Sequence, residues 1–231
     1  KKKSRRRKKK RPTAATGDTL LEKEQFYYAA TSTRWDKFFE AVRYVAAFVV
    51  ILANHIFSCG LSIVLTVGAP LTEAQFNWDV KQSGLLYAGA AIVGVIGFLC
   101  AVVISKALND RIVIIAANVI MIAGFVILAP FPIQVARFII GVSIISFGLP
   151  MGQALATSVL TKMLTRKQQG TGNGLMMSAG ALARIATPIW AAIVGAQYDY
   201  GAVFGISSLL LAGALVLNII FAKFMVAPSH I

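Results

Sequence analysis

The sequence has little of what a soluble enzyme or a metalloprotein needs. Of its 231 residues, two are cysteines, two are histidines and nine are acidic. Cys59 and Cys100 form no C-x-x-C pair, and His55 lies far from His230, so we predict neither a disulfide framework nor a metal site. The glycines of 170–174 lack the lysine of a phosphate-binding loop. We therefore expect no enzyme activity and no cofactor.

Apolar residues, by contrast, are abundant. Hydrophobic residues make up 57% of the chain, charged residues 14%, and the mean hydropathy is +0.72. The apolar runs are too long for soluble core helices and lack the alternation of barrel strands. The predicted fold class is therefore all-α integral membrane, with six transmembrane helices. The predicted spans are approximately 42–67, 83–104, 112–129, 138–160, 174–196 and 203–226.

The segment before the first span has a different composition. Ten of the eleven residues from Lys1 to Arg11 are basic. We predict that residues 1–40 are a cytosolic, largely disordered linker and that residues 41–231 are the transmembrane domain. Beside a bilayer, a polybasic run favours binding to anionic lipid over nucleic acid. Because the chain begins with Lys, we expect a fragment of a longer protein, with a half-size protein that must dimerise as the alternative.

Lysine and arginine also predict the orientation. They occur before the first span, after the second and fourth spans at Lys106, Arg111 and Lys162, and in the tail after the sixth. Cytoplasmic loops carry an excess of these residues. We therefore expect both termini to be cytoplasmic, with Arg137 as the exception to the pattern.

Arg184 is the least expected residue of the fifth span. It lies near the centre of the span, where a charged side chain is costly and marks a functional site. At helical spacing its face also carries Gly170, Asn173, Gly180 and Pro188, whereas bulky apolar residues lie opposite. The pattern predicts that Arg184 points inward rather than toward lipid.

Arg184 has no counter-charge within the predicted spans, because none of the nine acidic residues lies there. Three partners are open: an anionic solute, a carboxylate on a missing half or partner, or backbone carbonyls and polar side chains such as Gln153, Asn54 or His55. These three side chains and Tyr87 are also the polar candidates for lining a solute pathway.

Small residues and prolines predict where helices approach one another. The fifth span carries Gly170, Gly174, Gly180 and Pro188, and the fourth contains Pro150 among glycines. Small residues allow close helix contact in membranes, and proline loosens a helix where neighbours can satisfy the freed carbonyl. We expect these five residues to serve helix packing.

The loop after the second span resembles a known signature. Residues 105–111, S-K-A-L-N-D-R, are similar to the second-half version of the major facilitator superfamily motif, G-x-x-x-D-R-x-G-R. Only Asp110 and Arg111 are kept. The two glycines and the final basic residue of the motif are replaced.

Later segments resemble one branch of that superfamily. They are G-L-P at 148–150, T-K-M-L at 161–164 and A-R-I at 183–185. Together they resemble the last three spans of the lysosomal branch linked to neuronal ceroid lipofuscinosis type seven, with plant vacuolar transporters as more distant relatives. The resemblance covers roughly residues 83–226.

The resemblance implies the carboxy-terminal half of a twelve-helix secondary transporter, built as a 3+3 inverted repeat. Such a carrier moves a small solute by alternating access. The alternatives for this solute are an anion and a solute whose transport is coupled to protons. Its implied partners are an amino-terminal six-helix half or a second copy, and its implied location is a lysosomal, endosomal or vacuolar membrane. A non-transporting scaffold or trafficking component and a passive channel are the alternatives. The implied cavity residues are Asn54, His55, Tyr87, Gln153 and Arg184, and the implied conformational latch is Asp110 with Arg111.

Overall fold

A computed structural model describes the backbone of residues 34–225 and the side chains of residues 41–225. This part of the chain contains helices and no strand, and all six helices are long and apolar enough to cross a membrane. The predicted all-α fold with six transmembrane helices is therefore confirmed, whereas most of the predicted linker lies outside the described residues. The helices are α2 (Arg34–Phe76), α3 (Val80–Ala107), α4 (Asp110–Leu128), α5 (Val135–Met163), α6 (Arg166–Gln197) and α7 (Tyr200–Phe221).

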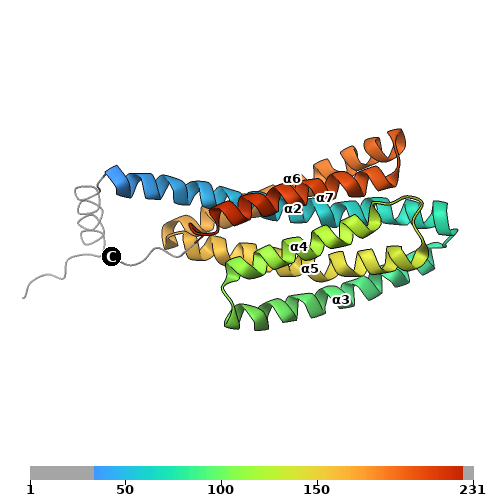
Figure 1. Cartoon of the computed structure of the whole chain (residues 1–231), viewed down its shortest axis with the longest axis horizontal. Coiled ribbons are helices and arrows are strands. Elements are labelled where there is room, and N and C mark those ends of the chain that lie inside the picture. The colour runs from blue at the N-terminus through green and yellow to red at the C-terminus, as the bar shows by residue number, and fades with distance from the viewer. Residues whose placement is uncertain (1–33, 226–231) are drawn as a thin grey trace, which may run out of the picture. The chain divides into compact units, whose positions relative to one another are not determined.

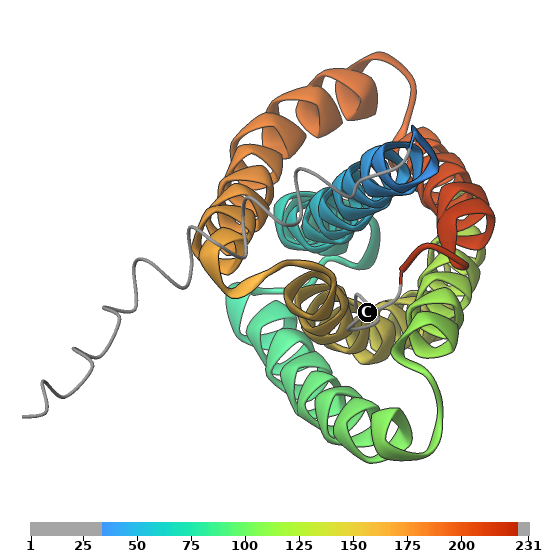
Figure 2. The same ribbon diagram turned by 90° about the vertical axis from the view of Figure 1, so that its left-hand side faces the viewer.

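Residues from Val42 onward form one compact unit in which the helices run side by side (Figure 1). Seen along the helices, α2 and α5 lie toward the inside, whereas α3 and α6 lie at the edge (Figure 2). Burial agrees: half of the most apolar stretch of α2 and of α5 is buried, against 17% for α3 and 22% for α6. Large surfaces of α3 and α6 are therefore uncovered by the described chain.

Acidic caps begin two of the helices and keep the preceding connections short. The Asp79 carboxylate accepts a hydrogen bond from the Gln82 backbone N–H at 2.7 Å, and the Gln82 side chain accepts one from the Asp79 N–H at 3.1 Å. The Asp199 carboxylate accepts from the Ala202 N–H at 2.6 Å. Each cap satisfies a free N–H group and places negative charge at the positive end of the helix dipole.

Helix ends differ from the predicted apolar spans at several places: α2, for example, continues to Phe76 rather than ending near residue 67. α6 begins at Arg166 rather than at Gly174, because the helix continues through polar residues that no proline interrupts. α7 ends at Phe221, since the chain then forms a turn in which the Phe224 N–H donates to the Phe221 carbonyl at 2.9 Å. Hydropathy locates apolar surface, whereas backbone hydrogen bonding decides where a helix stops.

α3 packs on α5 through two glycines. A Cβ on Gly97 would overlap the Phe147 carbonyl oxygen, and one on Gly94 would lie 3.2 Å from the Ser146 carbonyl oxygen. Pro150 has no N–H, so the Ser146 carbonyl lacks its usual partner one turn ahead. Pro150 is one of the residues predicted to serve helix packing. In the structure, the backbone of α3 lies against the Ser146 carbonyl, which this proline leaves without a partner.

Two apolar clusters fill the interior of the bundle. One contains the fully buried rings of Phe57, Phe125 and Phe204, and the other contains Ile114 and Leu160. Lipid tails are as apolar as these side chains, so burial from lipid contributes little. Close van der Waals contact between the helices therefore holds the bundle together.

Candidate functional site

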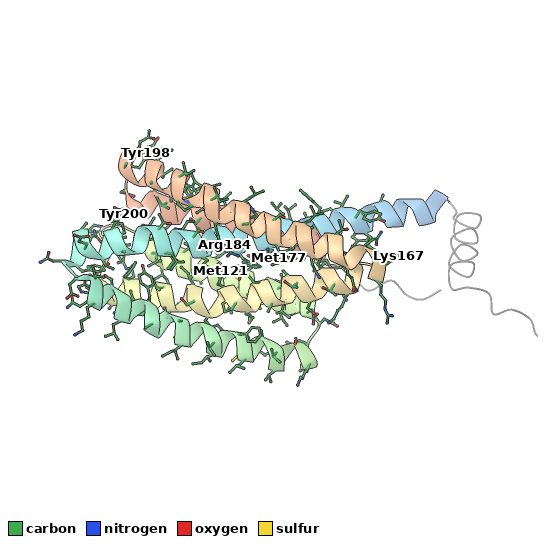
Figure 3. The ribbon with its side chains drawn as sticks, turned by 180° about the vertical axis from the view of Figure 1, so that it is seen from behind. Met121, Lys167, Met177, Arg184, Tyr198 and Tyr200 are labelled. Carbon is green, nitrogen blue, oxygen red and sulfur yellow. The ribbon has the colours of Figure 1, made fainter. Side chains whose placement is uncertain are left out.

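Arg184 lies on α6 between Lys167 at one end of the helix and Tyr198 at the other (Figure 3). Its side chain is exposed. Among residues 41–225 the only ion pair joins Lys162 to Asp110, and no hydrogen bond from the Arg184 guanidinium to another residue is present. Within the described chain this cation is unneutralised.

A cavity of about 360 Å³ opens beside Arg184 between α2, α5 and α6. Small-molecule sites commonly measure roughly 300–1,000 Å³, so the cavity suits a small solute. The lining residues are Asn54, Ser58, Gln153, Thr157, Asn173, Met176, Met177, Gly180 and Arg184.

α2 and α6 lie close together at Gly180. A Cβ there would lie 3.2 Å from the Ser58 hydroxyl and 3.6 Å from the Asn54 amide nitrogen. Asn54, which is 8% exposed, donates from Nδ2 to the Met176 carbonyl at 3.2 Å. The absence of a side chain at Gly180 therefore lets α2 hydrogen-bond directly to the backbone of the arginine helix.

His55 makes the next contact of the same interface. Its Nδ1 lies 2.7 Å from the Ala179 carbonyl oxygen. Because a carbonyl oxygen can only accept, Nδ1 carries the proton in this contact. His55 thus holds α2 against α6, but it is not part of the cavity lining.

Gln153 and Thr157 form the α5 wall. The Gln153 side chain donates from Nε2 to the Ser58 hydroxyl at 3.2 Å, which links α5 to α2. The Thr157 hydroxyl lies 3.0 Å from the Gln153 carbonyl oxygen of its own helix and 3.4 Å from the Met176 sulfur. These contacts fix the polar side chains of the wall before any solute arrives.

Tyr87 lies away from this cavity. Its hydroxyl donates to the Val64 carbonyl at 3.1 Å and lies directly over Gly68, where any Cβ would overlap it. Tyr87 is a predicted cavity residue, but its ring instead joins α3 to α2, because its hydroxyl donates to the Val64 carbonyl.

The expected packing contacts at Gly170 and Gly174 are not present in the described part of the chain. No atom lies within 4 Å of a Cβ built on either residue, because this part of α6 has no helix in front of it. Gly172 makes the contact instead: it is buried, and a Cβ there would overlap the Leu164 side chain. Pro188 is half-buried and, lacking an N–H, leaves the Arg184 carbonyl without its usual partner.

Asp110 and Arg111 lie together in the first turn of α4. The Asp110 carboxylate accepts from the Lys162 ammonium at 2.5 Å and from the Ser158 hydroxyl at 2.9 Å, which joins α4 to α5. Arg111 donates to the Ala222 carbonyl at 2.8 Å, at the end of α7. The pair therefore connects the first turn of α4 to two other helices, and it lines a second cavity of about 430 Å³.

Three of the predicted cavity residues, Arg184, Gln153 and Asn54, lie together around one cavity in the structure. Ser58, Thr157 and Met176 line the same cavity without having been predicted. The spacing in the sequence indicates two of them. Ser58 lies four residues after Asn54, and Thr157 lies four residues after Gln153, so each pair shares one face of its helix. Met176 has no such signal, since its role depends on how α6 is rotated against α2.

The described residues contain no group of three or more His, Cys, Asp and Glu side chains that could hold a metal ion. Cys59 and Cys100 are free thiols. The cavity lining offers a guanidinium, amides, two hydroxyls and thioethers for binding.

Comparison with other proteins places this geometry in a family. No curated protein matches the chain. A crystal structure of the POT family transporter PepTSo is similar with a TM-score of 0.64 and 18% sequence identity, over 77% of this chain and 37% of that one. At this identity the similarity concerns the fold, and the chain corresponds to well under half of the PepTSo chain. The family profile described as Major Facilitator Superfamily matches residues 47–230, so the chain belongs to the Major Facilitator Superfamily.

Proposed function

We propose that this chain forms the carboxy-terminal half of a secondary transporter that moves a small anionic solute past Arg184 by alternating access. The observation that carries the proposal is the unneutralised guanidinium beside a cavity of about 360 Å³. Membership of the superfamily supports transport as the class of function, and transporters of this kind bind solute near the bilayer midplane between two repeats.

The lack of a counter-charge for Arg184 in the described chain supports an anion as the solute. A desolvated cation in a membrane needs a partner. Polar groups of this half do not supply that partner in the structure, because the amides of Asn54 and Gln153 bond to Met176 and Ser58 and neither accepts from Arg184. An anionic solute, or a carboxylate supplied by the rest of the carrier, remains.

The rest of the carrier is the proposed partner of the open face of α6. PepTSo is far longer than this chain, which corresponds to 37% of it. The open glycines Gly170 and Gly174 leave room for another helix to pack closely. We assign this face to an amino-terminal six-helix half, with a second copy of the chain as the alternative that cross-linking would detect.

The Asp110–Arg111 pair is the proposed conformational latch. Its contacts with α5 and α7 exist only while the ends of these helices stay together. A conformational change that separates the helix ends must break them, so the pair favours one state of the transport cycle over the other.

Location and orientation complete the proposal. Loops rich in lysine and arginine support cytoplasmic termini, and the basic run Lys1 to Arg11 supports contact with anionic lipid. The sequence segments shared with the lysosomal branch support a lysosomal, endosomal or vacuolar membrane. A fluorescent fusion found at the plasma membrane alone would contradict that location.

The test is anion binding and uptake by the full-length protein in proteoliposomes, using a panel of carboxylates, phosphate, sulfate and chloride. Arg184→Gln is expected to weaken the affinity for the bound anion roughly 30-fold or more, because a desolvated charge pair loses one partner. Arg184→Lys should retain part of the affinity, since the charge remains while the bidentate geometry is lost. Arg137→Gln is the matched control, because this arginine is bound to the Pro130 carbonyl far from the cavity.

Unchanged uptake and affinity in Arg184→Gln would contradict the proposal. If Arg184→Gln instead prevents folding or complex assembly while the wild type binds no anion, the scaffold function is favoured. Flux that grows linearly with solute concentration and never saturates would favour a passive channel.

A further inference from the structure

Hydrogen bonds within the protein hold the polar side chains that line the Arg184 cavity. Asn54 donates from its amide nitrogen to the Met176 carbonyl at 3.2 Å. A carbonyl oxygen cannot donate, so the orientation of this amide is settled, and Oδ1 and the second N–H of the amide are left over. Asn54 therefore offers the cavity an acceptor.

The α5 wall follows the same rule. Gln153 donates from Nε2 to the Ser58 hydroxyl at 3.2 Å, which leaves its Oε1 as an acceptor. Thr157 donates its hydroxyl hydrogen to the Gln153 carbonyl at 3.0 Å, which leaves oxygen lone pairs on the hydroxyl. Three of the lining residues, from two helices, thus carry an oxygen that can accept, in a cavity whose one cation is Arg184.

We infer that the solute is an organic anion that also carries hydroxyl or amine donors, such as a hydroxy acid or a sugar acid. This inference rests on the proposed function, in which Arg184 binds the anionic group. The donors of the solute would satisfy the oxygens of Asn54, Gln153 and Thr157. A simple anion of equal charge brings no donor, so it would displace water from these oxygens without replacing the hydrogen bonds.

The fixed position of Asn54 strengthens the preference for a solute with donors over a simple anion. Asn54 is almost fully buried at the α2–α6 contact, where Gly180 has no side chain to hold α2 away. The Asn54 amide cannot rotate without breaking the bond to Met176. The acceptors are therefore in position before the solute binds. The protein itself thus determines the preference for a solute that carries donors.

The experiment compares matched probes by ligand-induced thermal stabilisation of the full-length protein. Lactate and propionate differ by one hydroxyl, gluconate carries several, and chloride carries none. The wild type is expected to bind lactate at least about 10-fold more tightly than propionate and to bind gluconate most tightly, since a site built to hydrogen-bond a hydroxyl rejects the analogue lacking it. Asn54→Leu should remove most of this preference.

Thr157→Val provides a second variant, because Thr157 is exposed and its loss leaves the α2–α6 contact intact. It should lower the affinity for gluconate several-fold and leave that for propionate unchanged. Equal affinity for lactate and propionate in the wild type, or tighter binding of chloride than of gluconate, would overturn the inference while Arg184→Gln still abolishes binding. If none of the probes binds, or if binding does not depend on Arg184, the inference and the proposed function fail together.

Discussion

Two charged sites of this bundle differ, because the described chain supplies an ionic partner at one and none at the other. Asp110 pairs with Lys162 and Ser158, and its neighbour Arg111 is bound to the end of α7. Arg184 has no such partner among the described residues and faces a cavity. The first arrangement is explained by contacts within the chain. The second is complete only when something outside the described chain binds, and for that reason it is the better guide to function.

The largest effect on stability is expected from reversing the charge at the paired site. Asp110→Lys removes the acceptor for two hydrogen bonds and places two cations together at a helix N-terminus. We expect the free energy of unfolding to fall by about 2 kcal/mol, since hydrogen bonds to charged groups contribute about 1.5–3 kcal/mol. Thermal unfolding followed with a thiol-reactive dye at Cys59 and Cys100 measures it.

The matched comparison is Arg184→Gln in the same unfolding assay. Arg184 makes no hydrogen bond within the described chain, so its loss should leave the unfolding temperature nearly unchanged while solute binding is lost. Equal destabilisation by the two variants would show that Arg184 has a structural partner and would remove the distinction between the two sites.

A smaller effect is expected from the exposed partner of Asp110. The Lys162 side chain is 60% exposed, whereas that of Asp110 is 11% exposed. Exposed ion pairs contribute about 0–1 kcal/mol and are screened by salt. Lys162→Gln should therefore destabilise the protein by less than about 1 kcal/mol at low salt and by less still at high salt. A loss as large as that of Asp110→Lys would mean that the pair is shielded from solvent.

Some of this could be predicted from the sequence for physical reasons. Six apolar runs are long enough to determine six helices, because the bilayer fixes both length and polarity. The face shared by Arg184, Asn173 and Gly180 also follows from the period of a single helix. These three residues line one cavity.

Contacts between helices could not be predicted in the same way. Tyr87 joins α3 to α2 rather than lining the cavity, because its hydroxyl donates to the Val64 carbonyl. Gly97 is closely packed and Gly174 is open, although both are glycines in apolar helices. A small residue permits close approach, but the rotation of each helix decides whether a neighbour is present.

The most direct test gives Arg184 a counter-charge inside its own helix. Ala181 is exposed and lies one turn before Arg184, so a glutamate there can pair with the guanidinium. Ala181→Gln has the same shape without the charge and is the control. We predict that Ala181→Glu binds the solute anion at least about 10-fold more weakly than Ala181→Gln, with both proteins folded. Equal affinity in the two variants would contradict the claim that the charge of Arg184 is held free for the solute.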